Sequence, residues 1–449
     1  MTTIAAIATP LGIGGIGVIR ISGPEAIAIA RQVIERGNTQ IHPRMAVMVT
    51  VRDPESQAVL DQGILLYFQG PNSYTGEDVV ELQLHGNSQL LLRVLHVVIA
   101  QGAQLARPGE FTRRAFINGK LDLTEAESVA DLIHAEGTAA QSLALHQLKG
   151  KLSGEIMAVR VPLIQILEQI EASIDFPDEV EGIDRADARA TIHSLSTRLA
   201  EIVRLQNFGR LIREGVKCVI MGRPNVGKSS LLNALLGEDR AIVSDIAGTT
   251  RDFIDVSLRY RDWVLNFVDT AGIRAQAEGI EQQGIDKIDA LIAVADVALW
   301  VVDSTTPITS EDEALLDKIA VVAIKLGVAN KSDLNPSFGP TTPGISEWIS
   351  VSAKTGQGID ALKAHIYDAV IATQSEGNLE FACNSRQLAC VIQANQALAQ
   401  VLAGMDAGFE DDVLSIDLKT AILKLGEVTG DVVTEEVLDG IFSRFCVGK

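Results

Sequence analysis

Residues 219–237 read VIMGRPNVGKSSLLNALLG, and this stretch decides the fold of the central part of the chain. It places Gly222, Gly227, Lys228 and Ser229 in the pattern G-x-x-x-x-G-K-[ST]. An apolar run precedes the pattern and leucines at helical spacing follow it, which predicts a strand, a loop and a helix in that order. Because the N–H groups of such a loop point at an anion, we expect it to hold the phosphates of a nucleotide.

The side chains of this loop predict a nucleoside triphosphate bound with magnesium. Lys228 can reach the β- and γ-phosphates, and the hydroxyl of Ser229 can ligate Mg²⁺. A glycine turn before an ordinary helix is the alternative, and the strand and helix on either side disfavour it. We therefore expect the phosphate-binding residues to be Asn225, Val226, Gly227, Lys228, Ser229 and Ser230.

Four further segments lie downstream in the order that a GTP-binding domain requires. Thr249-Thr250-Arg251-Asp252 predicts the first switch, and Asp269-Thr270-Ala271-Gly272 predicts contacts to Mg²⁺ and the γ-phosphate. Asn330-Lys331-Ser332-Asp333 and Ser352-Ala353-Lys354 predict the pocket for the base. The Asp333 carboxylate can accept hydrogen bonds from N1 and the exocyclic amine of guanine, whereas adenine lacks that pair of donors. The nucleotide is therefore predicted to be GTP.

Two residues depart from the pattern of Ras-like GTPases. Those proteins carry a water-orienting glutamine after the D-T-A-G segment, whereas this chain has Ile273, which cannot orient water. We expect a carboxylate to replace it, with Glu281 preferred over Glu278. Asn225 is the second departure. Its side-chain oxygen either helps to bind a monovalent cation against the phosphates or belongs to a loop residue in an unusual conformation.

The composition indicates a globular protein with two or three domains. The chain has 449 residues, of which 47% are hydrophobic and 4% aromatic, and its formal net charge is −20. Such an acidic chain argues against a broad nucleic-acid-binding surface, because contacts to phosphates need clustered lysine and arginine. If RNA is the substrate, a partner protein is expected to supply much of the positive surface. A local basic cluster is nevertheless predicted from Arg107, Arg113, Arg114 and Lys120.

Neither the apolar stretches nor the cysteines indicate a membrane or secreted protein. The longest apolar stretch, residues 290–302, contains Asp296 and is too short to span a membrane. Residues 1–12 lack the basic region of a signal peptide, so we expect a cytoplasmic protein. The four cysteines, Cys218, Cys383, Cys390 and Cys446, show no C-x-x-C spacing. Neither a zinc site nor a disulfide framework is therefore expected.

The part before residue 120 is expected to be mixed α/β, with strands near residues 16–21, 47–51 and 64–68. Its glycines match G-x-G-x-x-G literally at Gly12, Gly14 and Gly17. A dinucleotide-binding motif needs a helix after the glycines, yet a β-prone run follows them here. A glycine-rich turn or bulge is the better interpretation.

Two helical parts flank the GTP-binding domain in the sequence. Apolar residues recur at three- and four-residue spacing from residue 121 to about 206, and the same pattern returns from residue 384. A GTP-binding domain inserted into a helical domain explains this order, and its two ends must then lie close together. The predicted boundaries are residues 1–120 for the N-terminal domain, 121–209 and 376–449 for the helical domain, and 210–375 for the inserted G domain.

Several blocks outside the G domain resemble one family. ATPLGIGGIGVIRISG near the N-terminus, GPNSYTGEDVVELQLHG at residues 70–86, ARPGEFTRRAFINGKLDLTEAE from Ala106 and the terminal FCVGK are similar to the MnmE family, also called TrmE, of tRNA modification GTPases. The resemblance covers essentially the full chain. Its implied fold is an α/β N-terminal domain that binds folate and dimerises, a split helical domain, and an inserted Ras-like G domain with a mostly parallel sheet.

The resemblance also implies an activity and partners. Members of the family act as homodimers with an FAD-containing partner, MnmG, in a heterotetramer. They add an aminomethyl or carboxymethylaminomethyl group to carbon 5 of the wobble uridine of certain tRNAs, using a one-carbon unit from tetrahydrofolate. GTP, GDP, Mg²⁺ and K⁺ are the other implied ligands. By similarity, 5-formyl-tetrahydrofolate or a related folate is bound at the positions that match Arg20, Glu81, Lys120 and Lys449.

The remaining residue roles follow from the same resemblance. Glu281 matches the catalytic acid, in agreement with the argument from Ile273. We count Glu281, Lys228, Arg251, Asp252 and Cys446 as candidate catalytic residues, although Cys446 is either a packed small hydrophobe or a reactive thiol. Mg²⁺ is expected on Ser229 and Thr250. The K⁺ positions match Asn225, Ser244, Ile246 and Thr249.

Two other functions are compatible with a GTP-binding domain. The first is a translational or ribosome-assembly GTPase that performs no modification chemistry, but such proteins append a basic RNA-binding module that this acidic chain lacks. The second is a folate-binding or folate-sensing protein in which GTP acts only as a switch. The N-terminal blocks favour tRNA modification.

Overall fold

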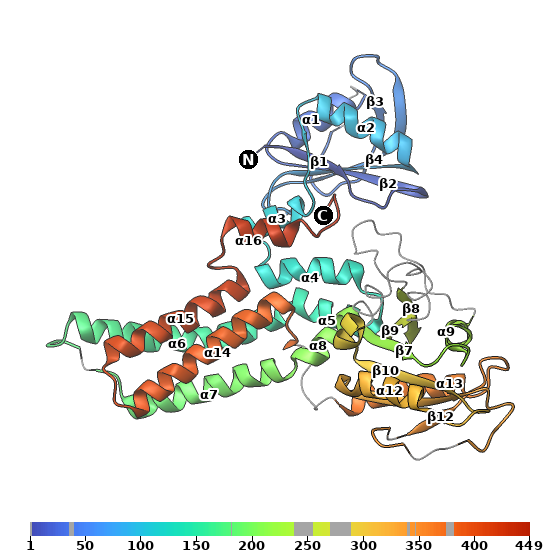
Figure 1. Cartoon of the computed structure of the whole chain (residues 1–449). Coiled ribbons are helices and arrows are strands. Elements are labelled where there is room, and N and C mark those ends of the chain that lie inside the picture. The colour runs from blue at the N-terminus through green and yellow to red at the C-terminus, as the bar shows by residue number, and fades with distance from the viewer. Residues whose placement is uncertain are drawn as a thin grey trace. The chain divides into compact units, whose positions relative to one another are not determined.

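The computed structural model describes residues 2–35, 40–180, 182–237, 255–269, 289–338, 342–345, 347–373 and 381–449 (Figure 1). The chain divides into two compact units. The first contains residues 1–133, 145–200 and 386–449, and the second contains residues 134–144 and 201–385. The predicted fold class is confirmed: an α/β N-terminal part, a helical part split in sequence, and an inserted domain with a mostly parallel sheet.

The N-terminal part of the first unit is a mainly antiparallel sheet in the order β3-β4-β5-β2-β1-β6. Its helices α1 and α2 pack on one face through the residues that alternate inward, such as Ile19, Ile21 and Leu82. The intervening residues, among them Arg20 and Glu81, therefore face the opposite side. The elements are β1 (Ile4–Ile7), β2 (Ile13–Ser22), α1 (Ala26–Val33), β3 (Val47–Arg52), β4 (Val59–Phe68), β5 (Val79–Asn87), α2 (Ser88–Ala100), β6 (Gln104–Leu105) and α3 (Glu110–Ile117).

In the literal G-x-G-x-x-G match, Gly14 and Gly17 lie on strand β2 and Gly12 precedes it, where a turn or bulge was predicted. Strand β2 pairs with β5 from Ile13 onward, and the register shifts between Gly14 and Gly17, which marks a bulge or irregularity. No helix follows these glycines directly, so the geometry of a dinucleotide-binding turn is absent at this place.

The helical part of the first unit combines segments from both ends of the chain. Helix α6 packs along α15, and an ion pair joins the buried Glu127 on α4 to the partly buried Arg386 on α14. The guanidinium donates to both carboxylate oxygens, and Gln387 also donates to Glu127. The helices are α4 (Leu123–His134), α6 (Lys151–Asp175), α7 (Arg185–Arg204), α14 (Ser385–Asp406), α15 (Asp411–Thr429) and α16 (Glu435–Phe442).

Among the described residues, α14 is the one helix long and apolar enough to cross a membrane by length and composition. Its buried residues Val391, Ala394, Leu398 and Val401 recur at helical spacing, as they do in the core helix of a bundle. Polar contacts to α7, such as the one between Ser196 and Asn395, tie it to its neighbours. We regard it as a core helix.

The second unit is built on a sheet in the order β12-β11-β10-β7-β9-β8, in which only the β8–β9 pair is antiparallel. Apolar clusters cover both of its faces. The elements are α8 (Gln206–Glu214), β7 (Val216–Met221), α9 (Lys228–Leu236), β8 (Asp255–Tyr260), β9 (Trp263–Asp269), β10 (Val297–Asp303), α12 (Ser310–Lys318), a short 3₁₀ helix (Ile319–Val321), β11 (Ile324–Asn330), β12 (Trp348–Ser350) and α13 (Ile359–Ala372).

The two ends of the inserted domain are joined directly. The guanidinium of Arg213 on α8, where the chain enters, donates to the carbonyls of Ala382 and Cys383, where the chain leaves. Gly209 packs against Ala382 at the same place. This closeness is what an insertion requires. Helix α5 (Thr138–Leu148) contributes Ala140 and Leu143 to the core of the second unit, although its periodicity did not indicate which core it would join.

Candidate functional site

The predicted phosphate loop lies where strand β7 ends and helix α9 begins. Strand β7 stands between β10 and β9, so the loop lies at the carboxyl edge of the sheet, at the point where the strand order reverses. Gly227 has φ 97°, and a Cβ there would overlap the amide of Asn330. Only glycine tolerates both conditions without strain. The N-terminus of α9 therefore faces the space in which a phosphate would lie.

Lys228 is buried at the first position of α9. Its Nζ donates to the carbonyl oxygens of Gly222 at 2.9 Å and of Arg223 at 2.8 Å. The loop thus holds the ammonium group beside its own backbone. Ser229 and Ser230 follow in the first helical turn and are exposed, as a metal ligand and a phosphate donor must be.

The segments predicted to bind the base are hydrogen-bonded to the predicted phosphate loop. Asn330 Nδ2 donates to the Val226 carbonyl at 2.8 Å, and Asn330 Oδ1 accepts from the N–H of Ala353 at 3.1 Å. Asp333 Oδ1 accepts from the hydroxyl of Ser352 at 2.7 Å. The structure therefore brings the phosphate loop together with two segments that lie more than a hundred residues later in the sequence. Lys354 follows Ala353 in the same turn.

Lys331 and Asn225 are also in contact. Both have left-handed backbone conformations, with φ 64° and 65°. Lys331 Nζ donates to the Asn225 carbonyl at 3.2 Å and to Asp303 Oδ2 at 2.6 Å. Burial raises the pKa of Asp303, but hydrogen bonds from Lys331 and Thr305 outweigh it, so its pKa lies below the usual range. Asp303 thus anchors a lysine that supports the phosphate loop.

Two residues that support this site were not predicted from the sequence. Arg223, inside the loop, donates from Nε to Asp312 at 2.8 Å, and the Asp312 carboxylate is fully buried in α12. Asp303 is the other. Neither pattern nor spacing relates these partners, because each is more than twenty residues from the group it holds. A carboxylate directly after the apolar stretch of residues 290–302 was the one available signal for Asp303.

Several predicted residues lie outside the described part of the chain: Ser244, Ile246, Thr249, Thr250, Arg251, Asp252, Thr270, Ala271, Gly272, Ile273, Glu278 and Glu281. For Asp269 the backbone is described. It ends strand β9 and pairs in register with Ile220 on β7, two residues before Gly222. The D-T-A-G segment therefore starts beside the phosphate loop.

A second candidate site lies in the first unit, on the sheet face opposite α1 and α2. Arg20 and Glu81 are register partners on β2 and β5, and Arg20 Nε and Nη2 both lie 2.9 Å from Glu81 Oε1. This pairing leaves Glu81 Oε2 without a partner among the described residues. Arg20 also donates to the carbonyl of Gly448 at 3.3 Å. The C-terminus therefore ends against this pair.

The C-terminal residues are fixed at this place by backbone contacts. Gly448 has φ 95°, and a Cβ there would overlap the Ile7 carbonyl of β1. Lys449 is half-buried, and burial, followed by the charge of Arg20, lowers its pKa although Glu81 opposes the shift. Cys446 is exposed, which excludes its interpretation as a packed hydrophobe, and the buried neighbour is Phe445.

Lys120 does not touch the Arg20–Glu81 pair. Its Nζ donates to the Pro71 carbonyl at 3.1 Å, and it lines a shallow pocket with Tyr74. The ring of Tyr74 lies 5.5 Å from the guanidinium carbon of Arg20, so the tyrosine connects the two places. Burial raises the pKa of Tyr74, and its hydroxyl pairs with Thr112 at 2.8 Å.

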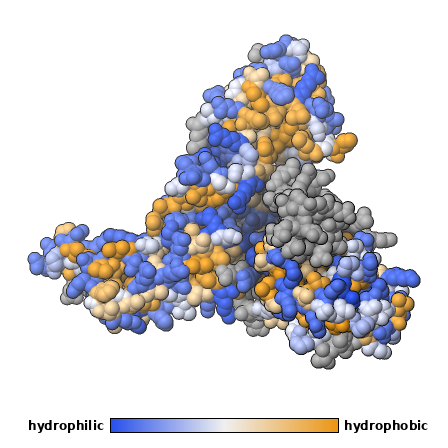
Figure 2. All heavy atoms as spheres, viewed as in Figure 1, coloured by the Kyte–Doolittle hydropathy of each residue, from blue (hydrophilic) through white to orange (hydrophobic). Residues whose placement is uncertain are grey.

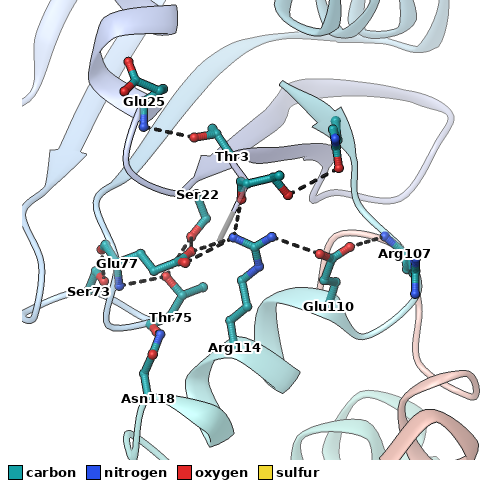
Figure 3. Close-up of polar contacts among 12 residues, drawn as sticks. Thr3, Ser22, Glu25, Ser73, Thr75, Glu77, Arg107, Glu110, Arg114 and Asn118 are labelled. Carbon is teal, nitrogen blue, oxygen red and sulfur yellow. Dashed lines mark hydrogen bonds and ion pairs between the residues drawn. The ribbon is translucent and has the colours of Figure 1, made fainter. Parts of the chain in front are cut away.

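A buried polar network supports the loop that carries Tyr74 (Figure 3). Arg114 is 5% exposed and binds Glu77 at 3.0 and 3.1 Å and Glu110 at 3.0 Å. Ser22 donates to Glu77, and Asn118 donates to the Thr75 carbonyl. The predicted basic cluster is therefore wrong as a surface patch. Arg114 is internal, and Arg113 pairs with Glu435, because carboxylates that are distant in sequence neutralise both.

Comparison with known proteins identifies relatives along the whole chain. The description "GTP-binding protein TrmE N-terminus" matches residues 3–120, and "MnmE helical domain" matches residues 123–446. The tRNA modification GTPase MnmE of Geotalea uraniireducens (strain Rf4) is 42% identical over 458 residues, which cover 100% of this chain and 99% of that protein. The protein of the same name from Cytophaga hutchinsonii is 39% identical over 452 residues, which cover 100% and 98%.

Among solved structures, the G domain of the T. maritima FeoB iron transporter is 24% identical, covers 34% of this chain and 98% of that chain, and has a TM-score of 0.28.

Proposed function

The chain belongs to the MnmE family of tRNA modification GTPases, and from this premise we propose that it is a potassium-dependent GTPase acting on the wobble uridine of tRNA. With an FAD-containing partner similar to MnmG, it adds an aminomethyl or carboxymethylaminomethyl group to carbon 5 of that base. The carbon comes from a tetrahydrofolate one-carbon unit.

The nucleotide part of the proposal is carried by Asn330, which bonds both to the phosphate loop and to the segment of Ser352, and by Asp333, which bonds to Ser352. Asp333 uses one carboxylate oxygen for Ser352, and its other oxygen has no partner among the described residues. A guanine base can donate to that side chain from N1 and its amine. Lys228 and the N-terminus of α9 hold the phosphates, and Ser229 is placed to ligate Mg²⁺ together with Thr250.

The proposal assigns hydrolysis to Glu281 and a bound cation. Ile273 cannot orient water, so Glu281 positions it. K⁺ would lie against the β- and γ-phosphates and neutralise charge there, held by Asn225, Ser244, Ile246 and Thr249. What supports this role for Asn225 is that the Lys331 ammonium holds its carbonyl while its side chain is exposed at the mouth of the loop. Its left-handed backbone agrees with both interpretations of this residue.

The second site fits a folate. Glu81 Oε2 can accept from the amino and ring N–H groups of a pterin, while Tyr74 offers an aromatic face. Arg20 and Lys449 supply positive charge beside Glu81, and Lys120 supplies it at the far side of Tyr74. A bound tetrahydrofolate would contribute a one-carbon unit at this place. Cys446 is the exposed nucleophile nearest in sequence to Lys449.

The proposed homodimer forms through the N-terminal domains. Figure 2 shows hydrophobic atoms gathered over the N-terminal sheet. Leu11, Ile13 and Ile16, in and beside the first half of β2, are all exposed, Ile13 completely so. A second copy of the chain would cover such a row of apolar side chains. The heterotetramer with the FAD partner, the binding of tRNA and the cytoplasmic location complete the proposal. With a net charge of −20, most contacts to tRNA phosphates fall to the partner.

Turnover in two salts tests the GTPase part of the proposal. GTP hydrolysis by the full chain should be at least about tenfold faster in KCl than in NaCl, because the cation stabilises charge that develops on the phosphates. Asn225→Ala should remove the difference and leave GTP binding largely intact, and ATP should be a poor substrate in both salts. Equal turnover in K⁺ and Na⁺ would refute the cation's role.

Nucleoside analysis of tRNA separates this function from the ribosome-assembly alternative. A strain that lacks the protein should lose the modified wobble uridine if modification is the function. It should keep that nucleoside and accumulate immature ribosomal subunits if the alternative holds.

A further inference from the structure

The pocket beside Lys120 is distinguished by its charge. It has a volume of about 670 Å³ and is lined by two cations, Arg44 and Lys120, and by an apolar wall of Leu66, Phe68 and Tyr74. No carboxylate is among the lining residues. A site that combines flat apolar surface with two positive groups suits a ligand with an aromatic body and an anionic end.

Neither cation is neutralised by the protein. Arg44 Nη2 donates to the Asn72 carbonyl at 3.3 Å and Lys120 Nζ to the Pro71 carbonyl at 3.1 Å. Within the described part of the chain, no carboxylate lies within ion-pair distance of either. Other arginines of this domain, Arg20, Arg52, Arg113 and Arg114, form ion pairs, whereas Arg44 and Lys120 share one pocket without a carboxylate. Two unneutralised cations in one pocket are therefore positioned for an external anion.

We propose that Arg44 and Lys120 form a subsite for a chain of γ-linked glutamates, so that the protein prefers polyglutamylated folates to the monoglutamyl form. This inference rests on the proposed folate site. Tyr74 borders both the pocket and Arg20, so a folate with its pterin at Glu81 extends its aminobenzoyl group and first glutamate along Tyr74 to Lys120, and only the further glutamates reach Arg44.

The net charge of the molecule opposes the binding of longer, more anionic tails. Each further glutamate adds one carboxylate to the ligand, and a chain with net charge −20 repels it at long range. Local cations must more than offset this repulsion if longer tails are to bind better. Arg44 is suited to bind a carboxylate through two N–H groups. Because the pocket is open to solvent, each added charge pair is expected to strengthen binding by about two- to fivefold, and salt should screen the effect.

Titration of the full-length protein with two ligands tests this subsite. We expect 5-formyl-tetrahydrofolate triglutamate to bind about three- to tenfold more tightly than the monoglutamate at low ionic strength, and the two to bind nearly equally at high ionic strength. Arg44→Gln should remove most of the advantage while leaving monoglutamate binding unchanged, which also shows that the variant is folded. Arg44→Lys should keep part of the affinity advantage of the triglutamate. Arg93→Gln removes the same charge from the exposed face of α2, outside the pocket, and should keep all of it.

The possible failures are distinguishable. Equal affinity of the wild-type protein for the two forms at low ionic strength would overturn the subsite and leave folate binding standing. Loss of both ligands in Arg44→Gln would also overturn it, because Arg44 would then serve the site as a whole. Binding of neither form to the wild-type protein would refute the proposed folate site itself, and the inference with it.

Discussion

At the scale of single residues, Asp333 is the side chain proposed to select guanine. In Asp333→Asn, an amide N–H group that donates replaces a carboxylate oxygen that accepts, and it faces an N–H donor of guanine. GTP affinity should therefore fall by about 2–3 kcal/mol, or 30- to 150-fold. Xanthine carries a carbonyl in place of the amine, so the same variant should bind XTP better than the wild-type protein does.

Competition of XTP and GTP for a fluorescent nucleotide measures both effects. Asp360→Asn is the matched control, because the Asp360 side chain is 98% exposed on α13 and should not affect either affinity. Unchanged GTP affinity in Asp333→Asn would show that Asp333 does not bind the base.

Cys446 should be the one thiol that reacts in the native protein. The other three cysteines are buried, and burial raises the pKa of Cys218 and of Cys390, which disfavours their reactive thiolates. A thiol-specific chromogenic reagent should therefore titrate one group in the folded protein and four after denaturation. Cys446→Ser should abolish the native reaction. Fast reaction of a second thiol would show that a buried cysteine is accessible.

The residue patterns predicted which segments form the site, but they did not predict all the contacts that hold those segments together. Gly227, Lys228, Asn330 and Asp333 could be proposed from the sequence because contacts to a single nucleotide require these residue types in a fixed pattern. Arg223 and Asp303 were not, since their partners come from other elements and only the fold brings them together. The same reason explains Arg114, which reads as a surface cation in the sequence but lies inside the domain.

At the scale of elements, the Glu127–Arg386 pair joins α4 to α14 across 259 residues of sequence. Glu127 is 8% exposed, and Arg386 binds it through two nitrogens. Removing one partner of such a pair leaves a poorly compensated charge in the interior. Arg386→Ala should therefore lower the free energy of unfolding of the helical part by about 3 kcal/mol.

Chemical denaturation followed by circular dichroism provides the measurement. Arg189→Ala is the control, because Arg189 pairs with Asp406 on the surface between α7 and α14 and should leave the transition unchanged within error. Equal effects of the two substitutions would mean that the buried pair contributes no more than a surface pair.

Periodicity predicted which segments are helices but not which core they join. The apolar spacing of residues 138–148 is helical, yet α5 contributes Ala140 and Leu143 to the core of the second unit. Its N-terminal residues bond to the turn at Asp262 between β8 and β9. Such a contact depends on tertiary packing, and a single sequence carries no periodic signal for it.

At the scale of the whole molecule, the account links GTP hydrolysis to chemistry at the C-terminal residues. The C-terminus meets β1 and Arg20 at the proposed folate site, and the helices that lead to it resume directly after the inserted domain. Closure of two G domains around GTP is proposed to rearrange those helices, and hydrolysis then drives a conformational step. GTP supplies no atom to the tRNA in this account.

The variant Glu281→Ala tests this link most directly. It should bind GTP and folate and form the homodimer, while its kcat for GTP should fall by about 10²-fold or more, the usual loss when a water-positioning group is removed. Glu278→Ala, three residues away in sequence, is the matched control and should hydrolyse GTP normally.

The central measurement is nucleoside analysis of tRNA from cells that contain Glu281→Ala as their only copy, at wild-type abundance. The modified wobble uridine should be lost in these cells and retained in cells that contain Glu278→Ala instead. Normal levels of the modified nucleoside in Glu281→Ala cells, with hydrolysis verified absent, would contradict the coupling of hydrolysis to modification.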